Sequence, residues 1–291
     1  RFFSLIYKKL KDKPMKNIYH IFLSTLIIGS LLSCTSSVDS SSEKEQDSGP
    51  YYVEFVSCNK GDEFNKANLS EMIEAWRSLP ISDALRGSYL YDPLREENAF
   101  GPSMWWELEW SSKDSADSAW QDSNQNNAFA AWAEKYENVM SCDGEGRNAW
   151  DIVVPISSTS FGEANESGYF YSQYWTCSYR EGSGRKELEE FLPLHTEKIE
   201  ASELENTGYH YGVYFDRRSM EASHADVQAN LVWGEWAISE EAMEVQNQNF
   251  NDNFQEVFEE FDKIASCLEQ PDIFDSWVLY SSGDQDKSPE F

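Results

Sequence analysis

Few residues of this chain have the types and spacing of a familiar reactive site. Downstream of residue 50 its histidines are His195, His210 and His224, all in the second half. The chain has no Gly-x-Ser-x-Gly motif, no glycine-rich phosphate loop and no Cys-x-x-Cys pair. Those patterns would indicate a serine nucleophile, a nucleotide site and a zinc or redox site. No acidic segment has the spacing of a calcium loop either. The sequence therefore predicts no catalytic residue, no metal ligand and no cofactor.

The carboxylates that remain as candidates correspond in pairs along the chain. Glu54 matches Gln173, and Glu109 matches Glu235, when the two halves of the sequence are compared. A carboxyl group on a covered sheet face must find hydrogen-bond partners or shift its pKa upward. These residues are therefore either functional carboxylates or hydrogen-bonded and rim-exposed ones.

Asparagines and aromatic residues complete the predicted site. Asn124 and Asn126 recur as Asn249 and Asn251 near the starts of predicted helices, where asparagine either caps a helix or positions a ligand. The chain has 11 tryptophans and 15 tyrosines; packing accounts for most of them, and the others are suited to lining a cleft. We expect an aromatic or apolar ligand cleft formed by Glu54, Tyr89, Trp106, Asn124, Asn126, Gln173, Tyr209, His210, Trp233, Asn249 and Asn251.

A repeated segment must position these residues. Residues 114–142 recur without a gap as residues 239–267. Apolar residues from Phe129 to Met140 fall at helical spacing in the first copy, and those from Phe254 to Ala265 do so in the second. The chain is therefore expected to contain two copies of one folding unit.

Short aromatic and β-branched runs predict the strands. The expected strands are residues 51–58, 88–91, 104–110 and 149–154 in the first half, and 170–177, 208–211, 230–236 and 276–280 in the second. An earlier helical stripe in each half places His195 at the position of Trp76, so we expect a packed histidine rather than a ligand. Both halves have the order βαββαβ.

This order is that of the ferredoxin-like fold, with four antiparallel strands and both helices on one face. The first strand and the second helix then end at the same edge of the sheet. Cys58 can reach Cys142, and Cys177 can reach Cys267. The fifth cysteine, Cys34, lies in the amino-terminal segment considered below. In an exported chain, the even number of remaining cysteines favours two disulfides over free thiols.

The strands carry apolar residues on both faces, so the face without helices must be covered. We expect two ferredoxin-like βαββαβ repeats packed sheet to sheet as an intrachain pseudo-dimeric α+β barrel. This arrangement resembles the dimeric α+β barrel superfamily over residues 51–281. Its members include antibiotic-biosynthesis-type monooxygenases, heme-degrading monooxygenases and chlorite-dismutase-like proteins. The heme-degrading members hold iron by a histidine on the second helix, and neither copy here has one, so the resemblance implies no heme.

The amino-terminal residues predict export. Residues 1–14 precede Met15 and are interpreted as an upstream extension, followed by an apolar stretch at 18–32. Leu31-Leu32-Ser33-Cys34 resembles the lipobox of bacterial lipoproteins, which implies that Cys34 is lipidated. Thr35 after the cysteine implies the outer membrane under the sorting rules of that class. An ordinary signal peptide or a membrane anchor is the alternative.

The mature chain is strongly acidic. Removing residues 1–33 takes away six of the 23 basic and one of the 52 acidic residues, which leaves 17 and 51 and a net charge of −34. Nucleic acid and anionic lipid surfaces are poor partners for such a chain. Rare basic points occur in two predicted loops, where they either meet an anionic group or are solvated: Arg95, Arg217, Arg218 and His224.

These observations predict a monomeric, membrane-tethered periplasmic lipoprotein that binds a small apolar or aromatic ligand or a partner protein. The alternative is a cofactor-independent monooxygenase-like enzyme, because some such enzymes in the superfamily position substrate with asparagine and tryptophan. The expected boundaries are a leader at 1–33, a tether at 34–50, repeats at 51–156 and 169–281, a linker at 157–168 and a disordered tail at 282–291.

Overall fold

The computed structural model describes residues 51–97, 99–217, 230–283 and 289–291. The predicted lipidation site Cys34 and the loop residues Arg218 and His224 lie outside these ranges. None of the helices in the described ranges has the length and apolar character needed to span a bilayer.

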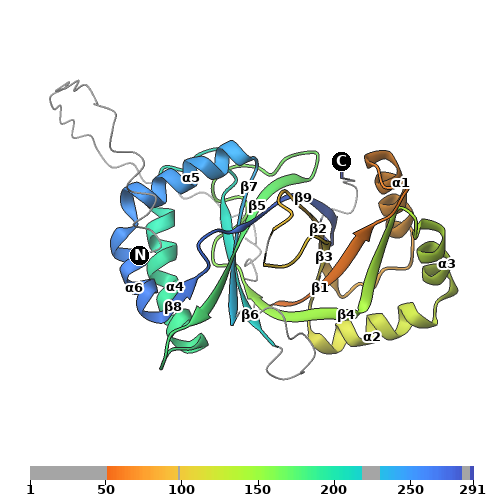
Figure 1. Ribbon diagram of the computed structural model, residues 1–291, viewed down its shortest axis with the longest axis horizontal. Helices are drawn as coiled ribbons and strands as arrows, with labels where there is room; N and C mark the ends of the chain where they lie inside the picture. The colour runs from red at the N-terminus through yellow and green to blue at the C-terminus, as the bar shows by residue number, and fades with distance from the viewer. Residues whose placement is uncertain (1–50, 98, 218–229, 284–288) are drawn as a thin grey trace, which may run out of the picture. The chain divides into compact units, whose positions relative to one another are not determined.

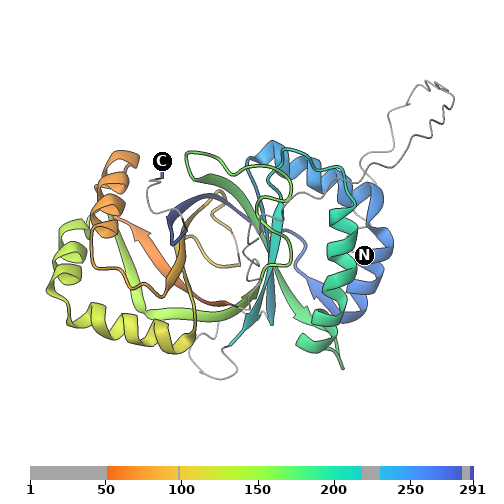
Figure 2. The same cartoon turned by 180° about the vertical axis from the view of Figure 1, so that it is seen from behind.

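Fifteen helices and strands follow one another in the described ranges (Figures 1 and 2). The first half contains β1 (Tyr51–Lys60), α1 (Lys66–Arg77), β2 (Leu85–Pro93), β3 (Met104–Trp110), α2 (Lys113–Gln125), α3 (Asn127–Tyr136) and β4 (Met140–Val153). The second half contains β5 (Tyr169–Tyr179), α4 (Arg185–Glu200), β6 (His210–Asp216), β7 (Leu231–Ala237), α5 (Glu240–Asn253), α6 (Gln255–Ile264), β8 (Ala265–Cys267) and β9 (Asp272–Ser281).

Eight strands form one closed antiparallel barrel. The strand order is β4-β1-β3-β2 in the first half and β9-β5-β7-β6 in the second, and β8 pairs with the end of β5. The halves are joined where β2 pairs with β9 and where β4 pairs with β6. The predicted α+β barrel is confirmed: the two sheets cover each other's faces and are also joined at their edges, so that the covered faces become the barrel interior.

The helices cover the outside of the barrel in two groups, α1, α2 and α3 on one side and α4, α5 and α6 on the other (Figure 1). Side-chain caps define where several of them begin: Asn65 accepts a hydrogen bond from the Asn68 amide at the start of α1, and Ser112 and Ser239 cap α2 and α5. We call the buried side chains between α1, α2, α3 and the sheet the first-half layer, and those between α4, α5, α6 and the sheet the second-half layer.

The repeated segment forms two helices in each half rather than one. Asn126 separates α2 from α3, and its side chain accepts a hydrogen bond from the Ala128 amide, which caps α3. The predicted stripe also extends too far, because Met140 and Ala265 already lie in strands β4 and β8. A break of one residue between two helices leaves the helical spacing of apolar residues on either side unchanged, so this spacing alone did not reveal the break.

Both predicted disulfides are confirmed. Cys58 lies directly opposite Cys142 in the register of β1 and β4, and Cys177 lies opposite Cys267 in that of β5 and β8. The Cα atoms are 4.0 and 3.9 Å apart. Each bond therefore links neighbouring strands within one half.

Aromatic side chains fill the barrel interior. Tyr91, Tyr174, Tyr214 and Trp236 are buried there beside smaller apolar residues. Glycine at 212 and 234 gives these rings room: a Cβ at Gly212 would lie 2.6 Å from the Trp236 ring. Interior positions are thus occupied by the chain's own side chains.

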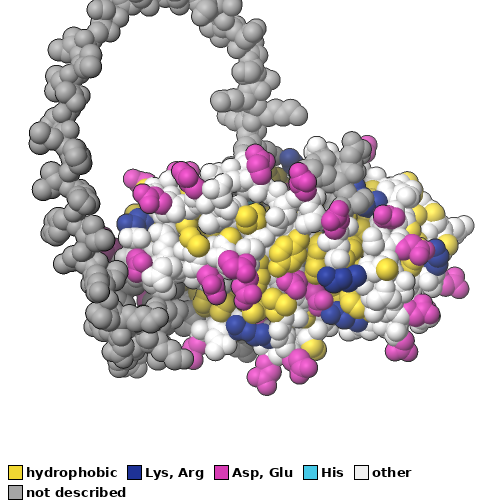
Figure 3. All heavy atoms as spheres, turned by 90° about the horizontal axis from the view of Figure 1, so that it is seen from above, with side chains coloured by type: hydrophobic (Ala, Val, Ile, Leu, Met, Phe, Trp, Pro, Cys, Tyr) yellow, Lys and Arg dark blue, Asp and Glu magenta, His cyan; other side chains and the backbone are white. Residues whose placement is uncertain are grey.

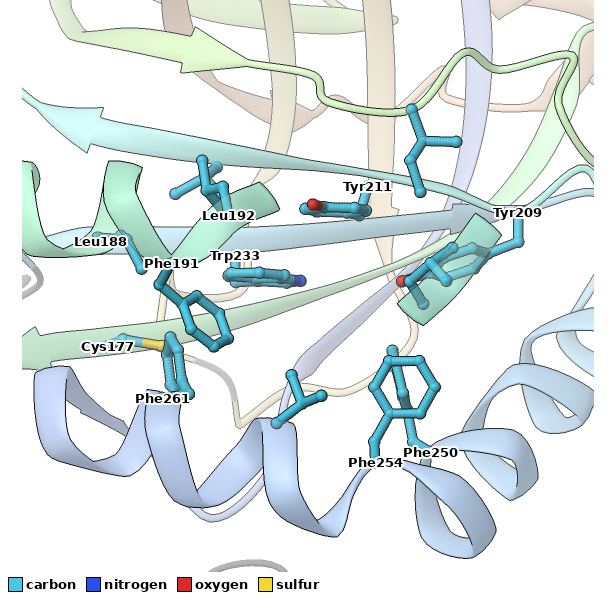
Figure 4. Close-up of a cluster of buried hydrophobic side chains, with 14 of the residues drawn as sticks. Cys177, Leu188, Phe191, Leu192, Tyr209, Tyr211, Trp233, Phe250, Phe254 and Phe261 are labelled. Carbon is cyan, nitrogen blue, oxygen red and sulfur yellow. The ribbon is translucent and has the colours of Figure 1, made fainter. Parts of the chain in front are cut away.

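The second-half layer is an aromatic core (Figure 4). His195 is packed among aromatic rings, as predicted. The imidazole of His195 meets the Trp233 ring edge-on at 4.7 Å, just as Trp76 meets Trp106 at 5.0 Å in the first half. Tyr211 is stacked on Trp233 with an interplanar angle of 1°.

Part of the predicted disordered tail is ordered. The Phe291 ring lies 5.3 Å from that of Trp277, and the Glu290 amide donates a hydrogen bond to the Ser167 carbonyl. An apolar terminal residue thus packs on the core, which the polar composition of residues 282–288 did not suggest.

Candidate ligand-binding layer

The predicted cleft residues are divided among three environments. Five of them belong to the sheet side of the two layers: Glu54, Trp106, Gln173, Tyr209 and Trp233. Tyr89 and His210 instead lie by the rings of the barrel interior, where Tyr89 contacts Phe170 and His210 contacts Trp236. The four asparagines lie on or between helices. The sequence predicted a single cleft, whereas the fold distributes these residues among the first-half layer, the second-half layer, the barrel interior and the helices.

The asparagines have local structural roles where contacts are given. Asn124 is exposed, Asn126 caps α3, and Asn249 donates hydrogen bonds to Ser202 and Gln246. Asn251 is half-buried on α5. The capping alternative thus describes Asn126.

Strand register corrects one of the predicted correspondences. Cys58 is opposite Met104 and Cys177 is opposite Leu231, so Trp106 and Trp233 occupy equivalent positions. By the same register Glu235 is equivalent to Leu108 and not to Glu109. Matching the shared Glu-Trp pair shifts the alignment by one residue, and one residue moves a side chain to the opposite face of a sheet.

The first-half layer contains a buried carboxylate with a cationic partner. Glu54 is 1% exposed, and Arg147 Nε donates to its Oε1 at 2.9 Å. Tyr52 Oη and the indole nitrogens of Trp110 and Trp120 also donate to it, at 3.0, 3.1 and 2.6 Å. The Arg147 guanidinium lies 4.9 Å from the Trp120 ring centroid. This carboxylate is fully compensated.

The second-half layer contains a buried carboxylate with neutral partners only. Glu235 is 2% exposed and accepts hydrogen bonds from Gln173 Nε2 at 2.5 Å, Trp175 Nε1 at 3.0 Å and Tyr209 Oη at 2.9 Å. Burial raises the pKa of Glu235, and the three donors oppose that shift. No arginine, lysine or histidine of the described ranges forms an ion pair with it.

The difference between the layers follows from substitutions at equivalent positions. Trp110 lies opposite Tyr52, and Ala237 lies opposite the equivalent Tyr171. The ungapped repeat matches Trp120 with Val245, but the helix caps correct this: Trp120 and Asn247 stand equally far from the capping serines of their helices and contact the equivalent residues Glu54 and Gln173. The second half thus has alanine and asparagine where the first has two indoles.

The position of Arg147 is also changed. Ala149 lies opposite Glu54, and Ile273 lies opposite the equivalent Gln173. Counting back from these residues places Pro271 where the first half has Arg147. The second half therefore lacks the guanidinium as well as both indoles, and gains one indole from Trp175.

Glu235 lies close beneath the surface. Gln173, its nearest donor, also donates to Asn247 Oδ1 at 3.2 Å. Asn247 and Trp175 are half-buried, whereas Gln173, Tyr209 and Glu235 are buried. Two members of the carboxylate network, Asn247 and Trp175, are therefore partly exposed to solvent.

A third buried carboxylate, Glu107, was not identified from the sequence. It is 2% exposed in the barrel interior and accepts hydrogen bonds from Tyr91 Oη at 2.5 Å and from Tyr214 Oη at 3.2 Å. The pKa of Glu107 is raised to about 8: burial is the largest cause, the charge of Glu109 nearby also raises it, and the hydrogen bonds from Tyr91 and Tyr214 oppose the shift. Because Tyr91 and Tyr214 belong to different halves, this network connects them. The only signal in the sequence was its place in β3, where alternation turns Glu107 to the face opposite that of Trp106 and Leu108.

The described basic loop residues bind the protein itself. Arg95 donates to Gln270 and to the Pro271 carbonyl, and Arg217 forms an ion pair with Asp151 at 2.9 Å. Arg185 also reaches Asp151. These contacts hold loops to the barrel, an outcome that neither sequence alternative described.

No family model matches this sequence, and no curated protein matches it. Among solved structures, an anthrone oxidase-like protein is similar with 8% identity over 80% of this chain and 95% of its own, at a TM-score of 0.44. The chlorite dismutase from Candidatus Nitrospira defluvii in complex with imidazole is similar with 8% identity over 79% of this chain and 92% of its own, at a TM-score of 0.45.

Proposed function

We propose that this chain is a lipid-anchored protein of the bacterial envelope whose second-half layer binds a small apolar or aromatic ligand. One observation carries the proposal. Equivalent positions that hold Trp110, Trp120 and Arg147 in the first half hold smaller or non-ionic residues in the second, around a buried carboxylate without a cation. The first half is closed by its own side chains, and the second is the half suited to a guest.

The architecture that we propose for this function is a pseudo-dimer. The strand orders β4-β1-β3-β2 and β9-β5-β7-β6 support two ferredoxin-like copies within one chain. Duplication lets one copy keep a structural role while the other acquires a ligand, as the unequal layers suggest.

The proposed location rests on Leu31-Leu32-Ser33-Cys34 and on the two disulfides. Residues 35–50 are serine-rich and acidic and have the composition of a flexible tether, so the anchor would leave the barrel free in the periplasm. On the face drawn in Figure 3, acidic side chains are spread around a central group of hydrophobic ones.

Native mass spectrometry of the protein purified from membranes tests this function. We expect a mass increment for the diacylglyceryl group that disappears in Cys34→Ala, and a retained or added small ligand. Absence of any ligand, with no thermal shift across a panel of aromatic and lipid-like compounds, would contradict the proposal.

A cofactor-independent oxygenase is the second candidate. The observation that favours it is a carboxyl of raised pKa, Glu235, next to the phenol of Tyr209, since such a pair can move a proton. Oxygen consumption with an electron-rich phenol, lost in Glu235→Gln, would support this candidate over simple binding.

A further inference from the structure

Comparison of the two layers indicates what kind of ligand the second one takes. Glu54 and Glu235 are both buried carboxylates between sheet and helices, and within the described residues only Glu54 forms an ion pair. We propose that the second-half layer binds an arylalkylamine: its ammonium group pairs with Glu235 where the first half has Arg147, and its aromatic ring takes the place of the Trp120 indole. This inference rests on the proposed binding function and names its ligand class.

The first half shows the geometry that the guest would reproduce. The Arg147 guanidinium is held 2.9 Å from Glu54 and 4.9 Å from the Trp120 ring centroid, so cation and ring are side by side. Trp120 Nε1 itself donates to Glu54 at 2.6 Å. One molecule carrying an amine and an aryl ring a short chain apart can supply both groups.

The second half is missing these same two groups. Pro271 and Asn247 stand at the positions of Arg147 and Trp120, and Ala237 stands at that of Trp110. Asn247 is half-buried and bonded to Gln173, so its displacement by a ligand opens the way to Glu235. Trp175, also half-buried, provides a ring beside the carboxylate.

Electrostatics favours a cation over a neutral guest. A buried carboxylate with neutral donors retains much of its desolvation penalty, and an added ammonium offsets it directly. Arg95 is the nearby cation, and its guanidinium donates to Gln270 and the Pro271 carbonyl rather than to Glu235. Because burial raises the pKa of Glu235, an ammonium ligand is expected to displace a proton from the fraction that is protonated.

Isothermal titration of the purified protein with tryptamine and with its neutral isostere tryptophol tests the inference. We expect tryptamine to bind at least roughly tenfold more tightly, which corresponds to about 1.4 kcal/mol. Titrations in two buffers of different ionisation enthalpy should reveal proton release with tryptamine and none with tryptophol. Glu235→Gln should abolish the preference for tryptamine, whereas Glu269→Gln, a change at an exposed acid on the adjoining segment, should leave it intact.

Pro271→Arg provides an independent variant that restores the first-half residue. It should raise the melting temperature and exclude tryptamine, because the new guanidinium occupies the site. Equal affinity of tryptamine and tryptophol, or a preference that survives Glu235→Gln, would overturn the inference while leaving the binding function in place. Failure of both compounds and of the wider aromatic panel would remove the binding function itself.

Discussion

The two layers of this protein solve the same problem in different ways. Each places one carboxylate between the sheet and the helices, where desolvation disfavours its charge. The first layer surrounds Glu54 with a guanidinium, two indoles and a phenol. The second surrounds Glu235 with an amide, an indole and a phenol, none of them charged.

Both layers therefore contain a buried acid, but at positions that are not equivalent. The acid is on β1 in the first half and on β7 in the second, and Gln173 stands at the equivalent of Glu54. The first half surrounds its acid with a cation and two indoles, and the second half, where smaller or neutral residues occupy those positions, is the one that we propose binds a ligand.

The largest effect is expected in the barrel interior, where Glu107 is buried and where the equivalent position of the second half is Gly234. Its pKa of about 8 in the folded state lies above the ordinary value of 4.5, so the fold prefers the protonated form. The stability from this preference is complete below pH 4.5 and is lost as the pH rises to about 8, at most roughly 5 kcal/mol. Glu107→Gln should abolish this decline in urea unfolding measured from pH 5 to 9.

Glu109→Gln is the companion variant: it should keep the decline but move it to lower pH, because the charge of the half-buried Glu109 helps to raise the pKa of Glu107. A decline that persists in Glu107→Gln would show that another group titrates. The facing groups are Glu109 and the phenols of Tyr89, Tyr91, Tyr174 and Tyr214.

The disulfides should contribute equally to the two halves. Their sequence separations are 84 and 90 residues, for which the loop-entropy relation gives about 4 to 5 kcal/mol each. The double variant Cys58→Ala, Cys142→Ala and the double variant Cys177→Ala, Cys267→Ala should therefore lower the free energy of unfolding by similar amounts. Urea titration of both measures this, and a loss confined to one half would contradict the symmetry.

Arg147→Met should make the first layer resemble the second. We expect a loss of about 3 kcal/mol, because a buried carboxylate is left without its cation. Adding Glu54→Gln should recover part of this loss, which a double-mutant cycle by thermal unfolding can measure. If the double variant is no more stable than Arg147→Met, the missing charge pair does not explain the loss.

His195→Phe should produce the smallest change, a gain of about 1 kcal/mol at neutral pH. The substitution keeps a ring against Trp233 and removes the buried Nδ1, which has no hydrogen-bond partner. Burial lowers the pKa of His195 to about 3, so the wild type loses stability as the pH falls from 6.5 toward 3. The gain should therefore grow on acidification, and calorimetry at pH 7 and 5 checks its sign.

The sequence predicted features that local pattern determines. Aromatic runs located most strands, the repeat revealed the duplication, and the position of His195 against Trp76 predicted a packed imidazole. The disulfide pairs followed because ferredoxin-like topology brings Cys58 to Cys142 whether the second cysteine ends a helix or begins a strand.

Features that depend on register were missed. Matching the shared Glu-Trp pair placed Glu109 against Glu235, one residue out of the strand register, and Glu107 was overlooked. The predicted cleft residues lie in different places for the same reason. A shift of one residue along a strand decides whether a side chain faces the helices or the barrel interior. Strand pairing and helix caps, and not the sequence match, identify Pro271, Ala237 and Asn247 as the equivalents of Arg147, Trp110 and Trp120.

The edge joints of the barrel have a consequence for assembly. β2 with β9 and β4 with β6 are hydrogen-bonded seams, and both cystines lie within halves rather than across a seam. The same seams can form between the first half of one molecule and the second half of another, provided that residues 157–168 cannot span the distance within one chain. Shortening that connection is therefore expected to yield a reciprocally swapped dimer, containing two complete barrels, on size-exclusion chromatography.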